Sequence, residues 1–166
     1  MTFQKNIFNS LKRRKKLPRL DELELDPFYL SPEEKEVLKN QYLREREMNT
    51  VDEKIAEYLD QINQFPFIAT IRSCQGHGYP GHISFRFTKP WHQKFIEDGI
   101  KPLISQKLCH IFWEVGDWLP TKTGLYFRWK ARFPEEKRDK FFQEFIRWLK
   151  EEAEKEAEKK SQTEPD

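Results

Sequence analysis

Four side chains capable of chemistry gather in a short polar turn between two apolar segments, within residues 67–87. They are Cys74, Gln75, His77 and His82. A thiol becomes a nucleophile when a nearby cation or imidazole lowers its pKa. Arg72 lies two residues before Cys74, and His77 follows it by three. Cys74 and His77 are therefore the candidate catalytic residues, although the pattern names no reaction.

The same turn is rich in glycine, with Gly76, Gly78 and Gly81. Glycine accepts positive φ, and successive backbone N–H groups can form a concavity that binds anions. The sequence predicts a site for an anionic or nucleotide-like ligand. Its expected contact residues are Arg72, Ser73, Cys74, Gln75, Gly76, His77, His82 and Arg86. The alternative is a structural turn in which Ser73 and Gln75 satisfy loop backbone and Cys74 is a small filler.

A zinc site is a second interpretation of these residues. Cys74-x-x-His77 supplies two ligand types that zinc accepts, and His82, Cys109 and His110 offer others. Adjacent residues of a strand point to opposite faces, so only one of Cys109 and His110 can join. The expected ligand set is then Cys74, His77, His82 and Cys109, or His110 in place of Cys109.

Basic residues on the expected strands suggest a polyanion as partner. They are Arg72, Arg86, Arg128, Lys130 and Arg132. If these strands are neighbours, the cations line one sheet face together with His82, where RNA or another polyanion can bind. Trp91, Trp118 and Tyr79 are candidates for stacking on a base. The structural alternative is a face that pairs with the acidic N-terminal helices.

The elements that must hold these residues predict an α+β fold. Expected strands cover 67–72, 82–87, 108–115 and 125–132, and expected helices begin at Ser31, Thr50, Thr88 and Pro134. Capping-box patterns mark the first two helices, and Gly99 and Pro102 are expected to end the third. In the second strand Ile83, Phe85 and Phe87 alternate with polar residues, which predicts a polar outer face. We expect about four mostly antiparallel strands with helices packed on them, and a long C-terminal helix.

The chain divides by charge into three expected parts. Residues 1–20 carry seven Lys or Arg and no acid, 21–150 form a single domain, and 151–166 form a charged helical extension and tail. The basic arm makes a non-enzymatic interaction module a third interpretation. No Gly-x-Gly-x-x-Gly follows a strand and no Gly-Lys-Ser/Thr loop occurs, which disfavours a dinucleotide fold or a P-loop nucleotidase.

Composition indicates a reducing environment. Two cysteines in 166 residues form no disulfide framework, and no apolar run approaches the ~20 residues that span a bilayer. We therefore expect a cytoplasmic protein without a transmembrane segment. The richness in Lys and Glu resembles that of thermophile proteins.

The turn Ser73-Cys-Gln-Gly-His77, followed by the strand His82-Ile-Ser-Phe85, resembles a motif of a group of small microbial proteins. It is more distantly similar to the tRNA wybutosine-synthesis methyltransferase family, which has a Ser-Ser-Cys-Ser-Gly-Arg turn and uses S-adenosylmethionine. His77 replaces the arginine of that turn and removes a fixed cation, so the activity is not carried over. The resemblance implies a pocket lined by Ser73, Cys74, Gly76 and His77. S-adenosylmethionine, like zinc, is a candidate cofactor.

Overall fold

A computed structural model describes residues 29–116 and 126–163 of the chain. In chain order its helices and strands are α2 (Pro32–Glu47), α3 (Glu53–Gln64), β1 (Ile68–Cys74), β2 (Gly81–Phe87), α4 (Trp91–Lys94), η2 (Phe95–Gly99), α5 (Ile100–Ser105), β3 (His110–Gly116), β4 (Tyr126–Phe133), η3 (Glu135–Lys137) and α6 (Arg138–Thr163). The α+β prediction is confirmed. The basic arm 1–20 and Trp118 lie outside the described residues.

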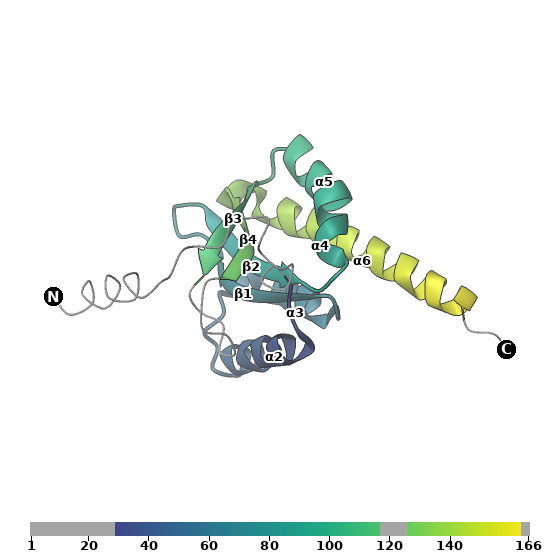
Figure 1. The fold of residues 1–166 in the computed structure, drawn as a ribbon. Helices are drawn as coiled ribbons and strands as arrows, with labels where there is room; N and C mark the ends of the chain where they lie inside the picture. The colour runs from purple at the N-terminus through teal and green to yellow at the C-terminus, as the bar shows by residue number, and fades with distance from the viewer. Residues whose placement is uncertain (1–28, 117–125, 164–166) are drawn as a thin grey trace, which may run out of the picture.

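The strands form one antiparallel sheet in the order β1-β2-β4-β3. The two predicted hairpins are therefore joined through the β2–β4 pairing (Figure 1). This order makes the basic residues of β4 direct neighbours of the polar positions of β2. The strands that carry the basic residues are therefore neighbours, as the predicted cationic face requires.

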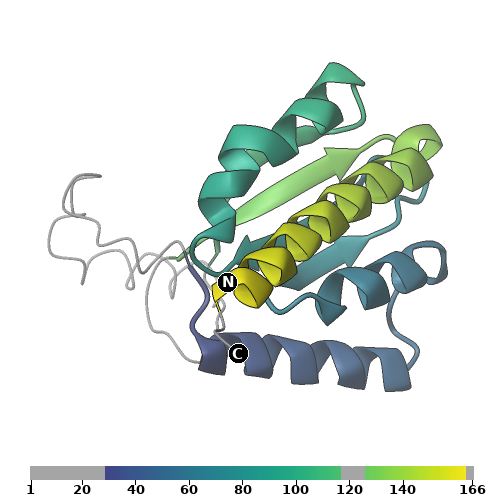
Figure 2. The same ribbon diagram turned by 90° about the vertical axis from the view of Figure 1, so that its right-hand side faces the viewer.

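One face of the sheet is covered by helices. Figure 2 shows α6 lying over the sheet, with α5 and α3 on either side of it. The core between them is rich in aromatic rings, which bury a large area per residue. Its fully buried members include Ile55, Leu59, Phe85, Phe95, Phe145 and Leu149. The apolar residues of β4, Trp129, Ala131 and Phe133, face this core as the alternation predicts.

Helix α2 lies along the β1 edge of the sheet, as both ribbon views show (Figures 1 and 2). It begins with the predicted capping box, in which the Ser31 hydroxyl accepts from the Glu34 N–H and the Glu34 carboxylate accepts from the Ser31 N–H. Its apolar side closes a second, small cluster of Leu30, Leu38, Ala69 and Ile71. This packing anchors the helix beside the start of the candidate site.

Two predicted helix boundaries are wrong. The capping residue of α3 is Asp52, without a side-chain cap, and the Thr50 hydroxyl instead donates to the Glu45 carbonyl at 3.1 Å. The third helix does not end at Gly99 or Pro102. The chain continues through both, by way of the wider turn of η2, to the end of α5.

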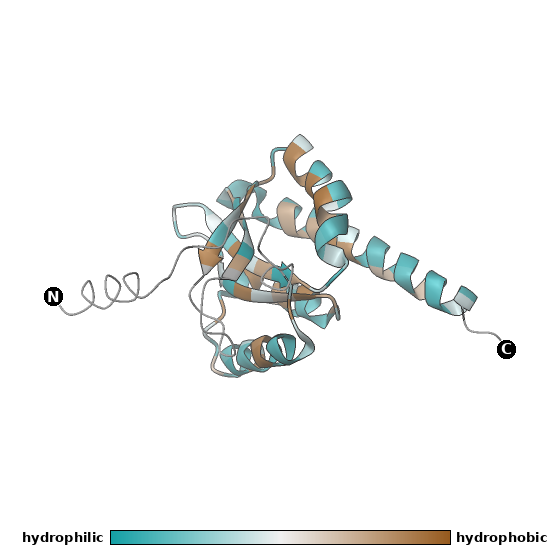
Figure 3. Cartoon of the chain, viewed as in Figure 1, coloured by the Kyte–Doolittle hydropathy of each residue, from teal (hydrophilic) through white to brown (hydrophobic). Residues whose placement is uncertain are grey.

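Helix α6 stays packed beyond the predicted end of the domain at residue 150. Glu152 is buried and lies 3.6 Å from the ammonium of Lys94, which also contacts Glu156 at 2.7 Å. The last turns are strongly hydrophilic (Figure 3). Within 29–116 and 126–163, no helix combines the length and the apolar character that crossing a bilayer requires.

Candidate functional site

A β-bulge in β1 decides which side chains reach the outer face of the sheet, the face opposite the aromatic core. The pairing with β2 shifts by one residue between Thr70 and Arg72. In a regular ladder Arg72 would oppose Ile83, which points into the core. Because of the extra residue, Arg72 opposes Ser84 and Cys74 opposes His82. The bulge therefore transfers Arg72 and Cys74 to the outer face.

The aligned positions on the outer face form two rows across the four strands. One row is Cys74, His82, Arg132 and His110, and the next is Arg72, Ser84, Lys130 and Phe112. Adjacent strands lie about 4.8 Å apart, so each row brings its cations within a few strand spacings. We call Arg72, His82, Lys130 and Arg132 the basic face. Arg72 and Arg132 are exposed, and neither guanidinium makes a hydrogen bond or ion pair with the described residues.

One carboxylate, Glu114, lies among these cations. It accepts from the guanidinium of Arg128, lies 3.3 Å from the ammonium of Lys130, and accepts from the Ser84 hydroxyl at 3.2 Å. Burial opposes its ionisation, but the hydrogen bond and charge of Arg128 and the charge of Lys130 outweigh this and lower the pKa of Glu114. Glu114 therefore offsets the positive charges of Arg128 and Lys130 on β4. It does not pair with Arg72 or Arg132.

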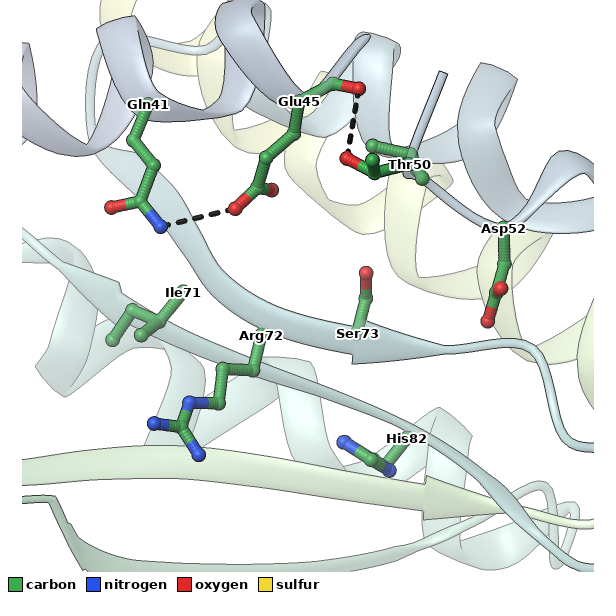
Figure 4. A pocket seen from close by; sticks show the side chains of 9 residues that line it. Gln41, Glu45, Thr50, Asp52, Ile71, Arg72, Ser73 and His82 are labelled. Carbon is green, nitrogen blue, oxygen red and sulfur yellow. Dashed lines mark hydrogen bonds between the residues drawn. The ribbon is translucent and has the colours of Figure 1, made fainter. Parts of the chain in front are cut away.

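An open cleft of about 490 Å³ adjoins the basic face (Figure 4). Its lining comes from α2, the α2–α3 loop, β1 and β2: Gln41, Glu45, Thr50, Val51, Asp52, Ile71, Arg72, Ser73 and His82. Arg72 and His82 belong both to the cleft and to the basic face. Burial, and then the charge of Lys130, lower the pKa of His82, so its imidazole is neutral at neutral pH.

In the glycine turn where the anion concavity was predicted, two backbone N–H groups already donate to carboxylates of the protein. The Gln75 N–H donates to Asp52 at 2.8 Å, and the Gly78 N–H donates to Glu135 at 3.0 Å. The Gln75 side chain accepts from the Lys54 N–H at 3.0 Å. Gln75 therefore fastens the turn to the start of α3, which is the structural role considered from the sequence.

Cys74 and His77 do come together, and a third residue joins them. The ligand atoms of Asp52, Cys74 and His77 all lie within 4.8 Å of one another, with 3.6 Å between the Asp52 carboxylate and the His77 imidazole. Among the residues that the structure describes, no other group of three or more His, Cys, Asp or Glu has this geometry. Asp52 was missed because its sequence surroundings indicate only a helix start.

The other expected zinc ligands do not join this group. Cys109 is buried in the main core, where burial raises the pKa of its thiol to about 12. His82 is on the basic face, and His110 is exposed on the edge strand β3. The predicted set of Cys74, His77, His82 and Cys109 is not assembled, because the chain brings Asp52 to the turn instead.

Two residues of the predicted polar outer face of β2, Ser84 and Arg86, are buried, each 1% exposed. The Arg86 guanidinium lies 3.6 Å from the Glu34 carboxylate of α2 and donates to the Tyr29 carbonyl at 3.1 Å. At Arg86 the fold therefore contains the structural alternative considered from the sequence, in which the sheet face pairs with an acidic helix. Arg86 therefore supports α2 and does not face a ligand.

The aromatic residues considered for stacking on a base also divide into buried and exposed ones. Trp91 is buried and stacks on Phe67, with 3.5 Å between ring centroids, so it cannot receive a base. Tyr79 is 55% exposed at the turn, and Phe112 is 40% exposed in the second row of the outer face. These two rings are available for stacking.

Comparison of the chain with protein-family models, curated proteins and solved structures gives no match. The resemblance of the turn to the microbial motif and to the methyltransferases stays a prediction. The residues of the site alone carry the functional proposal.

Proposed function

We propose that the protein binds a single-stranded nucleic acid or its nucleotides, with phosphates on the basic face and a nucleoside in the adjoining cleft. The observation that carries this proposal is that Arg72 and His82 belong to both surfaces. Exposed guanidinium groups without an ion pair are ready to bind phosphate, often through two parallel hydrogen bonds.

The distribution of charge favours a ligand with several phosphates over a small anion. Arg72 on β1 and Lys130 on β4 are separated by two strand spacings, roughly 10 Å. The cations of the basic face come from β1, β2 and β4, so a strand of nucleotides can meet them with several phosphates at once. The exposed rings of Tyr79 and Phe112 supply the stacking surfaces that sequence-tolerant binding of single strands uses.

The cleft supports a nucleoside more than a phosphate. Its α2 side carries Gln41 and Glu45, and its floor carries the hydroxyl of Ser73 (Figure 4). Amide, carboxylate and hydroxyl groups can pair with the edges of a base or the hydroxyls of a sugar. The Glu45 carboxylate would repel a phosphate, so phosphates are directed to the basic face.

The protonation of His82 supplies a further expected property. Its pKa is lowered in the free protein by burial and by Lys130. A bound phosphate would raise that pKa, because it stabilises the imidazolium. Binding should therefore take up a proton and become tighter as the pH falls through the His82 pKa of the complex towards the lower pKa of the free protein. The variant His82→Gln should lose this dependence.

Fluorescence anisotropy with labelled single-stranded RNA and DNA homopolymers tests the proposal. We expect binding by the wild-type chain and weaker binding by Arg72→Ala and by Arg132→Ala. Arg147→Ala is a matched control, since Arg147 is an exposed arginine on α6, bound to Glu144 and Glu151 and remote from the basic face. Absence of binding to both polymers and to nucleotides, or equal losses in all three variants, would refute the proposal.

A further inference from the structure

The α2–α3 loop and the β1–β2 turn bring three different metal-binding side chains to one point. Asp52 comes from the loop, Cys74 from the end of β1 and His77 from the turn. From these contacts we propose that Asp52, Cys74 and His77 bind a divalent transition-metal ion of the zinc class. The proposal goes beyond nucleic-acid binding and does not depend on it.

The donor set fits zinc in type and spacing. Thiolate, imidazole and carboxylate are the three donors that zinc takes from proteins, with bonds of about 2.0–2.3 Å. In a tetrahedral site such bonds put the donor atoms roughly 3.3–3.7 Å apart. The Asp52–His77 separation of 3.6 Å already lies in this range, and all three donor atoms lie within 4.8 Å. Closing the set therefore needs movements of about 1 Å or less.

The donor chemistry also selects among metals. A thiolate and an imidazole are too soft for magnesium or calcium, which prefer sets of oxygen ligands. Asp52 and a deprotonated Cys74 together bring two negative charges, which a divalent ion neutralises. With three protein ligands and His77 exposed, a fourth position stays open to water or to a ligand atom.

The surroundings hold the ligands in place. The Gln75 N–H donates to the Asp52 carboxylate, and the Gln75 side chain is itself held by the Lys54 N–H. Hydrogen bonds of this kind orient a carboxylate ligand and fix its position. Gly76 and Gly78 have φ values of 91° and 83°, and this tight path carries His77 back towards Cys74. The Tyr79 hydroxyl lies 3.9 Å from the Cys74 sulfur, within hydrogen-bond distance of the thiol.

Titration of the metal-free full-length protein with cobalt(II) tests the proposal, because cobalt replaces zinc and reports a thiolate ligand by a charge-transfer band. We expect a single equivalent to produce the band and zinc to abolish it. Cys74→Ser should lose the band. Asp52→Asn, which keeps an acceptor for the Gln75 N–H, and His77→Gln should each weaken binding by about tenfold or more.

The chain offers matched controls for both residue types. Cys109→Ser and His110→Gln alter residues that belong only to the sequence-predicted set and lie outside the group of Asp52, Cys74 and His77, and both should bind cobalt as the wild type does. Absence of the band in the wild-type protein would overturn the proposal. So would loss of the band in Cys109→Ser, or unchanged affinity in Asp52→Asn. Far-ultraviolet circular dichroism of each variant separates loss of a ligand from loss of folding.

Discussion

The two positive-φ glycines of the β1–β2 turn provide a matched pair of substitutions. Gly76 has φ 91° and Gly78 has φ 83°, so alanine costs similar backbone strain at either position. Their surroundings differ. A Cβ on Gly76 would lie 2.6 Å from the Tyr79 carbonyl oxygen and 2.8 Å from the Glu135 Cγ, whereas a Cβ on Gly78 would meet nothing within 4 Å.

The geometry sets the expected magnitudes. Left-handed backbone costs a residue with a Cβ about 1–2 kcal/mol, which is the whole expected loss of unfolding free energy for Gly78→Ala. Gly76→Ala carries this cost and a clash with backbone, and overpacking of this kind adds about 1–3 kcal/mol. We therefore expect Gly76→Ala to lose about 2–5 kcal/mol in total.

Urea unfolding of both variants and the wild type measures the difference. Hydrogen exchange at the amide of residue 78 gives a local readout, since this N–H donates to Glu135, the side chain that a Cβ on Gly76 displaces. Gly76→Ala should speed this exchange more than it speeds exchange in β2. Equal destabilisation by the two substitutions would refute the turn geometry on which the position of His77 depends.

Three further predictions concern buried and paired charges. Burial and then the charge of Arg86 lower the pKa of His92 to about 4. Since the unfolded chain takes up this proton near pH 6.5, the unfolding free energy should fall by roughly 3 kcal/mol between about pH 6.5 and 4, and His92→Asn should lose that part of the pH dependence in urea titrations. Arg86→Leu leaves the Glu34 carboxylate buried and should cost roughly 3–5 kcal/mol in urea unfolding; a loss below 1 kcal/mol would contradict the pairing. Glu114→Gln removes the carboxylate from among the cations and should tighten oligonucleotide binding in anisotropy by about twofold to fivefold, equivalent to about 0.5–1 kcal/mol, while weaker binding would contradict the assigned role.

The sequence predicts the strands and helix starts well because the alternation of apolar and polar residues and the helix-capping patterns are local. The alternation in β4 correctly separates Trp129 and Ala131 from Lys130 and Arg132, and the Ser31 pattern correctly marks the start of α2. These features depend on residues a few positions apart, so they can be predicted before the tertiary fold is known.

The parts of the site that the sequence does not predict depend on contacts between distant segments of the chain. The bulge in β1 inserts a single residue, and nothing in the local pattern distinguishes it from regular alternation. Alternation places Arg86 on the outer face but does not reveal that Glu34 of α2 covers it. Asp52 meets Cys74 across 22 positions of sequence, and its neighbours Thr50 and Glu53 resemble a capping box.

The central claim is that phosphates bind the outer face of the sheet, and the salt dependence of oligonucleotide binding tests it most directly. For single strands, the slope of log Kobs against log salt falls by about 0.7 for each phosphate contact removed. The triple variant Arg72→Ala, Lys130→Ala, Arg132→Ala should therefore have a slope shallower by about 2 than the wild type. An unchanged slope, with the variant folded, would place the phosphates elsewhere and contradict the account.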